Sequence, residues 1–365
     1  MRISKPVAYA VSVVAAGALL AACSGMGSQS SGAAPSSMVP QHVSGTQLLA
    51  RLTTTSLAVK APAFRKHHSG KSWMSPDAAK APRLFYQSDS GTDEVYVLTL
   101  PGLSLKGTLT GFSEPQGECS NAKGNIWITN TGTEQILEYA RGGTTPIATL
   151  DDSTGYPVGC AVDSSNDLAV TNIFDFSGAG SVLVYKNSSG TPSSLSNPDQ
   201  YYYYFDGYDS SGNLYTSGRD ASGTYILSEC AAGATSCSTI TISGGTVYFP
   251  GAVQWYTPGN YLSVSDQLCG DTEAACAYWV TISGTSGTIT GTTDLSNYDG
   301  TDACDVVQSA IAANNQKYLA GGDYEYCGYT SSTSNRWAFD AGGKPTKYND
   351  TAGQDVPIGA AVSTK

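Results

Sequence analysis

Residues 114–150, EPQGECSNAKGNIWITNTGTEQILEYARGGTTPIATL, form one unit of a repeat that decides the fold. Residues 156–192, YPVGCAVDSSNDLAVTNIFDFSGAGSVLVYKNSSGTP, follow the same plan. Each unit begins with a proline–glycine step and a cysteine, turns at Asn, Asp or Ser, and continues as a short alternating strand that ends in Thr-Asn. A loop and a second alternating strand that ends in Tyr follow. Such self-similarity indicates a repeat architecture.

Four further segments extend the repeat along the chain. Residues 83–109 have its later part without the Pro-x-Gly beginning, and weaker matches occur at 201–229, 249–268 and 299–323. The units are roughly 40 to 54 residues apart, which leaves room for four short strands in each. No helical period occurs beyond residue 83. A β-propeller blade has this length and this strand content.

The end of the chain contains the Pro-x-Gly beginning that the first unit lacks. Residues 357–363 read PIGAAVS, so we expect the C-terminus to supply the innermost strand of the N-terminal blade. This closure removes the free sheet edges at the ends of the chain. The sequence therefore predicts an all-β fold, a six-bladed β-propeller over residues 83–365. A β-sandwich or a β-helix would have similar strand content but would not explain the divided repeat.

The repeat resembles the NHL-type repeat of six-bladed propellers. Its pattern is Pro-x-Gly, then Gly-Asn before an apolar strand that ends in Thr-Asn, then a strand that ends in Glu-Tyr. The resemblance covers roughly residues 83 to 363, and the individual units are degenerate. The same superfamily contains gluconolactonase-like hydrolases, streptogramin lyases, an amidating lyase and many binding proteins. The resemblance therefore implies a fold and leaves the activity open.

The first 22 residues have the features of an export signal. Arg2 and Lys5 precede an apolar run too short to span a bilayer, and small residues precede Cys23. Residues 20–23, LAAC, resemble a bacterial lipobox, which implies that Cys23 is acylated and becomes the new N-terminus. The alternative is an ordinary secretory peptide with a chance cysteine. Because Ser24 rather than Asp follows Cys23, a cell with two membranes would sort the protein to the outer one.

Residues 23–82 are expected to form a flexible linker between the lipid and the propeller. Their composition is rich in Ser, Gly, Ala and Pro, which cannot bury enough apolar surface to offset chain entropy. Residues 24–82 contain six Lys or Arg and one acid, whereas residues 83–365 contain eleven against twenty-nine. An acidic domain is repelled by phosphate, so we expect no nucleic-acid partner.

All three histidines, His42, His67 and His68, precede the predicted propeller. General-base chemistry by histidine, Ser-His or Cys-His pairs and His-ligated metals are therefore excluded from the domain. Two adjacent histidines in a linker could bind a stray metal ion, but we expect no metal site there.

Eight cysteines remain after Cys23, an even number that predicts four disulfides in an exported chain. The short spacings favour Cys230–Cys237 and Cys269–Cys276, each across a hairpin. Cys119, Cys160 and Cys304 share one repeat position. We expect Cys119 to pair with Cys160 in the next blade, and Cys304 to pair with Cys327.

The stretch YYYYFDG at 201–207 begins the fourth blade when residues 211–215 are aligned with residues 123–127. This alignment places Tyr203 opposite Pro115 and Gly207 opposite Cys119. Successive rings should then point to opposite faces of the innermost strand, some between blades and others into the central funnel. The alternative is that all four tyrosines pack between blades.

The same alignment nominates one residue per blade at the mouth of the funnel: Glu114, Tyr156, Tyr202, Phe249, Asp299 and Val356. Their neighbours are Tyr203, Tyr204, Asp206 and Asp302. Aromatic rings beside two carboxylates would suit a sugar ring or an aromatic or cationic ligand.

Two classes of function follow. The first is a monomeric, non-enzymatic, lipid-anchored module that binds a protein, a glycan or a small ligand at the cell envelope without a cofactor. The second is a calcium-assisted, lactonase-like hydrolase or lyase that uses Glu114, Asp299 and Asp302. The lack of histidine and of a convergent acid cluster favours the first class.

Overall fold

The computed structural model describes residues 70–365 except 271, 273, 313–316 and 324–331. The predicted signal peptide, Cys23, the three histidines and most of the predicted linker lie outside the described residues. Cys327 also lies outside them. No helix in the described part of the chain is both long and apolar enough to cross a bilayer.

The described residues form antiparallel sheets of short strands, in which consecutive strands are neighbours. The first sheet contains β1 (Trp73–Met74), β2 (Arg83–Asp89), β3 (Glu94–Thr99), β4 (Leu105–Leu109) and β25 (Ala361–Thr364). The second contains β5 (Pro115–Ser120), β6 (Ile126–Asn130), β7 (Gln135–Tyr139) and β8 (Pro146–Asp151). The third contains β9 (Gly155–Val162), β10 (Leu168–Asp175), β11 (Gly178–Tyr185) and β12 (Ser193–Leu195).

Two further groups of strands share one sheet because their outermost strands pair in parallel. The first group is β13 (Tyr202–Tyr208), β14 (Leu214–Arg219), β15 (Tyr225–Cys230) and β16 (Ser238–Ser243). The second group is β17 (Pro250–Tyr256), β18 (Tyr261–Asp266), β19 (Cys276–Ser283) and β20 (Ser286–Asp294). The last sheet contains β21 (Ser309–Ile311), β22 (Tyr318–Asp323), β23 (Thr333–Ala338) and β24 (Gly342–Asn349). The pairing of β16 with β20 covers two edges that would otherwise be exposed.

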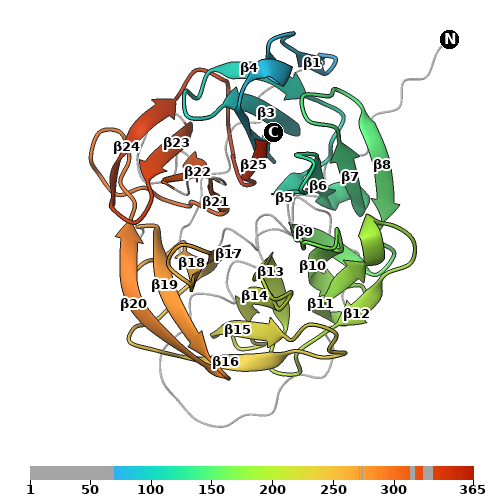
Figure 1. Ribbon diagram of the computed structural model, residues 1–365, viewed down its shortest axis with the longest axis vertical. Coiled ribbons are helices and arrows are strands. Elements are labelled where there is room, and N and C mark those ends of the chain that lie inside the picture. Colours follow the sequence, from blue (N-terminus) through green and yellow to red (C-terminus); the bar gives the residue numbers. More distant parts are fainter. Residues whose placement is uncertain (1–69, 271, 273, 313–316, 324–331) are drawn as a thin grey trace, which may run out of the picture. The chain divides into compact units, whose positions relative to one another are not determined.

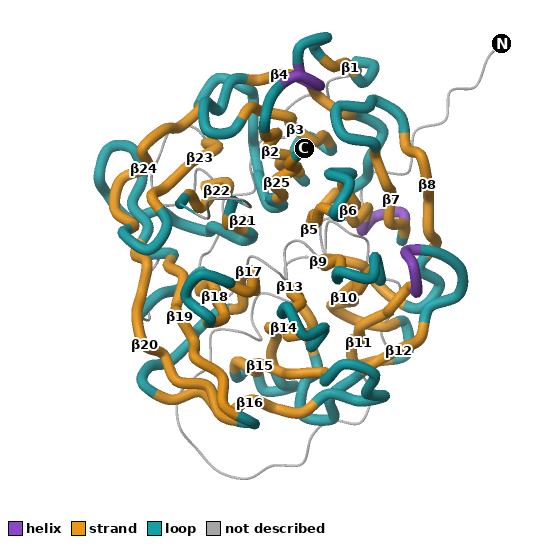
Figure 2. Tube along the Cα trace, viewed as in Figure 1, coloured by secondary structure: helices purple, strands orange, loops and turns teal. Residues whose placement is uncertain are grey.

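The sheets are arranged around a central axis, which makes the fold a β-propeller (Figure 1). Strands β25, β5, β9, β13, β17 and β21 lie nearest the axis, and β8, β12, β16, β20 and β24 lie at the periphery (Figures 1 and 2). Helical structure in the described residues is limited to three-residue turns, drawn purple in Figure 2.

The predicted closure by the C-terminus is confirmed. Strand β25 pairs with β2, from Arg83 opposite Thr364 to Tyr86 opposite Ala361, and Asp89 forms a bridge with Pro357. The buried Asp89 carboxylate also accepts hydrogen bonds from the backbone N–H groups of Asp355 and Val356, at 2.7 and 3.1 Å. The two ends of the described chain are therefore joined in one sheet.

The folded domain begins before the predicted boundary at residue 83. Trp73 and Met74 pair with Thr108 and Gly107 at the edge of β4, and Ala78 is buried in the first apolar cluster. The composition of this segment resembles that of the linker, but its few apolar residues still cover the outer edge of the first sheet.

Glycines of the Pro-x-Gly segments allow the innermost strands to approach closely. A Cβ at Gly359 would lie 2.1 Å from the carbonyl oxygen of Gln116, and one at Gly117 would lie 2.4 Å from that of Val158. A Cβ at Gly159 would lie 2.5 Å from the carbonyl oxygen of Tyr204. No side chain fits at these positions, because each Gly faces the backbone of the next innermost strand.

Hydroxyl groups of the second strands join neighbouring groups of strands at the same level. Thr171 on β10 donates a hydrogen bond to the carbonyl oxygen of Tyr204 at 2.8 Å. Ser217 on β14 donates to the carbonyl oxygen of Gly251 at 2.7 Å, and Ser88 on β2 donates to that of Gln116. These bonds satisfy buried polar groups where one sheet meets the next.

Apolar side chains fill the space between neighbouring sheets. Trp127 and Ile136 of the second sheet pack with Leu168 and Leu183 of the third in one buried cluster. Trp337 lies in a corresponding cluster between the last sheets. The core is thus a set of layers between sheets.

Three of the predicted disulfides are confirmed: Cys119–Cys160, Cys230–Cys237 and Cys269–Cys276. The first joins neighbouring sheets, and the other two close short connections. Cys304 is disulfide-bonded as well, while its predicted partner Cys327 is not among the described residues. Several disulfides are typical of an extracytoplasmic protein.

We expect Gly359→Ala to lower the free energy of unfolding by about 1–3 kcal/mol, because the new methyl group would overlap the backbone of β5. Urea denaturation of the wild type and the variant measures the change. Gly102→Ala is the control, since its Cβ would meet only the side-chain hydroxyls of Thr99 and Ser104, at 3.1 and 3.9 Å. Equal effects of the two substitutions would contradict the role of close strand contact.

We expect loss of Cys119–Cys160 to destabilise the domain more than loss of Cys230–Cys237. The sequence separations are 41 and 7 residues, so the loop-entropy relation gives about 4 and about 2.5 kcal/mol. Paired Cys→Ser variants compared by urea denaturation test this order. If neither variant nor reducing agent changes the unfolding transition, the disulfides contribute nothing to stability.

Candidate functional site

One face of the propeller is organised by prolines at the start of the innermost strands. Pro115, Pro157, Pro250 and Pro357 stand opposite an Asp or Asn at or near the end of the second strand: Asn130, Asn172, Asp266 and Asp89 respectively. We call this side the proline face.

The side-chain oxygens of Asp89, Asn130 and Asp266 hold the loops that lead into the innermost strands. Asp266 accepts hydrogen bonds from the backbone N–H groups of Tyr248 and Phe249, both at 2.9 Å. Asn130 accepts one from Ser113 at 2.7 Å. Burial raises the pKa of Asp89 to about 6, although backbone N–H groups oppose this shift.

The sheet that contains the four tyrosines departs from this arrangement. Tyr203 stands opposite Gly218, so the proline and the Asp or Asn are both absent. The amide of Gln200 occupies the space instead, because a Cβ at Gly218 would lie 2.2 Å from Gln200 Nε2. Gln200 Oε1 accepts a hydrogen bond from Thr216 at 3.1 Å, and its Nε2 donates to the carbonyl oxygen of Tyr202 at 3.2 Å. The loop before β13 is therefore held by its own side chains.

The four tyrosines have different surroundings, as alternation along a strand requires. Tyr203 is fully buried between the third and fourth groups of strands, where its hydroxyl accepts a hydrogen bond from Asn197 N at 2.6 Å. Tyr204 is buried near the axis, and Tyr201 and Tyr202 are partly exposed on the proline face. The pairing of Tyr203 with Gly218 agrees with the alignment of Tyr203 with Pro115.

An aromatic cluster lies on the proline face, made of Tyr156, Phe174, Phe176, Tyr201, Tyr202, Tyr204 and Phe249. The ring of Tyr202 lies edge-on to Tyr201 and Phe174, with centroids 4.8 and 4.9 Å apart. Tyr204 packs against Phe249 at 5.6 Å, and Tyr156 packs against Phe176 at 5.3 Å. Phe176 is 41% exposed, so the cluster reaches the surface. The structure thus brings together Tyr156, Tyr202, Tyr204 and Phe249, four of the predicted ligand-binding residues.

Arg219 adds a cation to the aromatic cluster. Its guanidinium carbon lies 4.7 Å from the centre of the Phe249 ring, a cation–π geometry. Burial raises the pKa of the Tyr204 hydroxyl to about 12, and Arg219 opposes this shift. Sequence reasoning missed Arg219, although it immediately follows the unusual Gly218.

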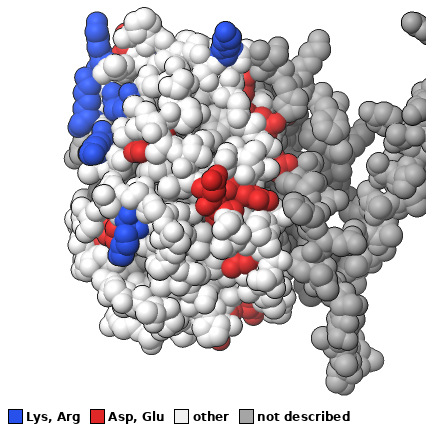
Figure 3. Space-filling model, turned by 90° about the vertical axis from the view of Figure 1, so that its right-hand side faces the viewer, with Lys and Arg blue, Asp and Glu red and all other residues white. Residues whose placement is uncertain are grey.

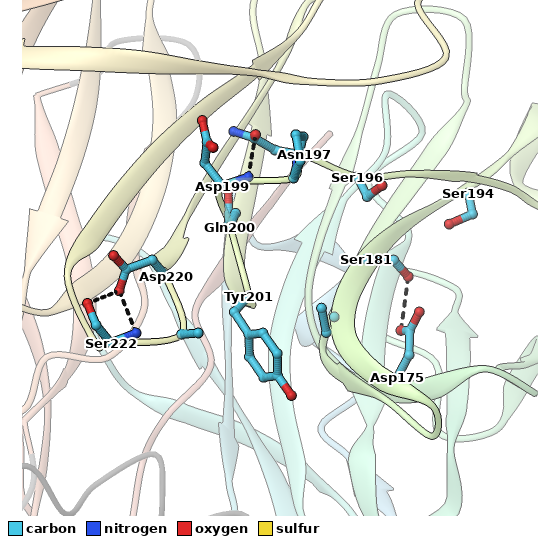
Figure 4. A pocket seen from close by; sticks show the side chains of 14 residues that line it. Asp175, Ser181, Ser194, Ser196, Asn197, Asp199, Gln200, Tyr201, Asp220 and Ser222 are labelled. Atoms are coloured by element: carbon cyan, nitrogen blue, oxygen red, sulfur yellow. Dashed lines mark hydrogen bonds between the residues drawn. The ribbon is translucent and has the colours of Figure 1, made fainter. Parts of the chain in front are cut away.

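A polar cleft of about 590 Å³ adjoins the cluster, between the third and fourth groups of strands (Figure 4). Asp175, Asp199 and Asp220 line it together with serine hydroxyls, and Tyr201 contributes an aromatic ring. Figure 4 shows Asp220 on one side of the Tyr201 ring and Asp175 on the other. Among the described residues, neither a lysine nor an arginine lines the cleft. Sequence reasoning missed the cleft because its residues come from separate repeats.

The acids of the cleft differ in their environment. Burial raises the pKa of Asp175 to about 6, opposed by the Ser181 hydroxyl that donates to it at 3.0 Å and reinforced by Asp152. The pKa of Asp220 is lowered because hydrogen bonds from Ser222 and Thr224 outweigh the effect of burial.

Charge is unevenly spread over the wider surface: on the side shown in Figure 3 most side chains are uncharged, while acidic ones gather near the middle.

Five of the six residues predicted at the funnel mouth directly precede the paired residues of the proline face: Glu114, Tyr156, Tyr202, Phe249 and Val356. Asp299 does not belong there. Its carbonyl oxygen accepts a hydrogen bond from Lys344 on β24, the outermost strand of the last sheet. The backbone N–H of Cys304 donates to Asp323 at the end of β22, which places Asp305 at the level expected of Asp299. The alignment of the repeats chose Asp299 instead of Asp305 because a long connection precedes β21.

The predicted calcium ligands Glu114, Asp299 and Asp302 do not form a group whose carboxylate oxygens all lie within 4.8 Å of one another. Within the described residues, one group of three cysteine or acidic side chains meets that criterion: Cys269, Cys276 and Asp294. Its two sulfur atoms form a disulfide, so they are not available as ligands.

Asp206 lies on the innermost strand β13 and is buried, as is Glu118 on β5. In the described part of the chain, neither carboxylate accepts a hydrogen bond. Burial raises the pKa of both groups well above the ordinary range, so each side chain is more stable when neutral. Asp206 was expected to contact ligand, but it is enclosed by the protein.

We expect Asp206→Asn to raise the free energy of unfolding at pH 8 and to have little effect near pH 4. The pKa of Asp206 is raised in the folded state above its value of about 3.9 in the unfolded state. As the pH rises above about 3.9, the unfolded chain loses this proton first, so the ionisation of Asp206 lowers the free energy of unfolding. Asn does not ionise, so the variant lacks this pH dependence. Urea denaturation at both pH values tests the expectation. A free energy of unfolding lower than that of the wild type at both pH values would contradict it. Asp209→Asn, in an exposed turn, is the control.

Comparison with known structures agrees with the fold. The chain is similar to a chain of the nidogen/laminin complex at 13% identity, covering 77% of this chain and 98% of that one, with a TM-score of 0.59. A protein of unknown function from Bacteroides caccae matches at 12% identity over 78% and 100%, with a TM-score of 0.58. TolB from Acinetobacter baumannii matches at 13% identity over 80% and 68%, with a TM-score of 0.53.

No family model and no curated protein matches the chain. At 12–13% identity, the similarity to these structures shows the β-propeller fold alone.

Proposed function

We propose that this protein is a non-enzymatic binding module, a six-bladed propeller of the NHL-like type that is anchored in the cell envelope through lipid on Cys23. Its ligand is a protein, a glycan or a small molecule of the envelope, and it contacts the proline face. The chain acts as a monomer and has no nucleic-acid partner, because the domain is acidic.

The observation that carries this proposal is that the fourth group of strands lacks the proline and the Asp or Asn that stand opposite each other elsewhere on the proline face. In this group Tyr203 stands opposite Gly218. The corresponding positions elsewhere are occupied by Pro115, Pro157, Pro250 and Pro357, each opposite an Asp or Asn. Beside this departure lie the aromatic cluster, the partly exposed Arg219 and the cleft. Proteins depart from their structural rules mainly at functional sites, so a ligand site is expected here.

A binding role is favoured over hydrolysis by the arrangement of the acids. The chain has no histidine beyond residue 68, and the proposed calcium ligands do not converge. The cleft acids Asp175, Asp199 and Asp220 lie beside serine hydroxyls, but the domain contains no histidine that could activate them. A partly exposed arginine over an aromatic ring is common in binding surfaces.

Export is supported by the disulfides, since such bonds persist outside the cytoplasm. We expect Cys23→Ser to move the protein from the membrane fraction to the soluble fraction, because the thiol that would carry the lipid is lost. Cell fractionation with immunodetection measures this. A variant that stays in the membrane fraction would show that something else holds it there.

We expect Arg219→Gln to weaken binding of the envelope ligand by about tenfold, because the cation of the aromatic cluster is removed. The measurement is biolayer interferometry with the full chain immobilised against fractionated envelope glycans and proteins. Arg336→Gln is a matched control, since Arg336 lies 4.6 Å over the Tyr318 ring on a different sheet. Equal affinities of both variants, or no binding by the wild type, would contradict the proposed site.

A further inference from the structure

We propose that the polar cleft binds an amine-bearing sugar unit of a glycan. The inference rests on the proposed binding function and assigns a ligand class to one part of the proline face. The cleft volume of about 590 Å³ lies within the range of about 300–1,000 Å³ that is usual for small-ligand pockets.

The groups that line the cleft suit a polyhydroxylated ligand. Carboxylates of Asp175, Asp199 and Asp220 accept hydrogen bonds, and the hydroxyls of Ser194 and Ser196 can both donate and accept. The lining exposes polar and apolar atoms in similar proportion, as the hydroxyl groups and the apolar face of a sugar ring require.

Each carboxylate is fixed through one oxygen and keeps acceptor capacity on the other. Ser181 donates to Oδ1 of Asp175 at 3.0 Å. Thr239 donates to Oδ2 of Asp199 at 2.8 Å, and Ser222 donates through its hydroxyl to Oδ1 of Asp220 at 2.7 Å. The acids are thus pre-oriented before a ligand arrives, which reduces the entropy cost of binding.

The charge of the lining selects among sugars. Three acids line the cleft, and no basic side chain in the described part of the chain does, so a sugar acid or a phosphorylated sugar would be repelled. An ammonium group would gain charge-assisted hydrogen bonds to the carboxylates, which are stronger than hydrogen bonds between neutral groups. An amino sugar is therefore favoured over a neutral or an acidic one.

Tyr201 supplies the apolar contact that a pyranose ring needs. Its side chain is partly exposed and stands between the turn that carries Asp220 and the strand end that carries Asp175 (Figure 4). The Tyr202 ring packs against it at 4.8 Å and limits its rotation. A sugar that stacks on Tyr201 would reach carboxylates on either side.

Three tetrasaccharides of matched length test the inference by isothermal titration calorimetry with the full chain: glucosamine, N-acetylglucosamine and galacturonic acid tetramers. We expect the glucosamine tetramer to bind at least tenfold more tightly than the acetylated one, and the galacturonic acid tetramer not to bind. Equal affinity for the first two, or preference for the acidic tetramer, would overturn the inference.

Asp220→Asn should reduce affinity for the glucosamine tetramer about tenfold, with Asp209→Asn as the matched control. Each carboxylate accepts hydrogen bonds from the backbone N–H groups of the residues two and four positions later in the chain, so the two turns are similar. Asp209, however, lies outside the cleft. An equal loss in both variants would overturn the assignment. If the chain binds an envelope fraction in an Arg219-dependent way but binds no tetramer, the sugar inference fails and the proposed function stands.

Discussion

Close approach of neighbouring innermost strands is the constraint on which the fold depends. At Gly117, Gly159 and Gly359 the backbone of the next strand occupies the space that any Cβ would need. This proximity lets Thr171 and Ser217 reach carbonyl oxygens in the next group of strands. The sheets are therefore joined by hydrogen bonds as well as by apolar layers. Because few positions carry this constraint, the rest of the sequence can vary, in keeping with structural similarity at 12–13% identity.

The proline face follows from the same geometry. Asp266 and Asp89 each end a second strand, and their carboxylate oxygens fix the loop that enters the neighbouring innermost strand. Gly218 cannot do this, so Gln200 and Asn197 hold the loop before β13 from within. The loop then lies beside a cleft, and Arg219 is placed over an aromatic ring. The change at Tyr203 and Gly218 thus coincides with the cleft and with Arg219 on this face.

Electrostatics separates the acids of the domain into two kinds. Asp206 and Glu118 are enclosed and favour the neutral state, so they weaken folding as pH rises. Asp199 and Asp220 are close to solvent and are held by hydrogen bonds at the surface of the cleft. The acids that line the cleft can attract a cationic group, whereas Asp206 and Glu118 are sealed from ligands.

The sequence by itself determined the repeat, the closure at Pro357 and the short-range disulfides, because these follow from residue order and spacing. It also placed Tyr156, Tyr202 and Phe249 at one level of the ring, since each precedes a recognisable strand start. It failed at Asp299, where a long connection of unknown path precedes the strand. The cleft was decided only by the tertiary structure, because its walls come from two groups of strands that meet only after the sheets pack around the axis.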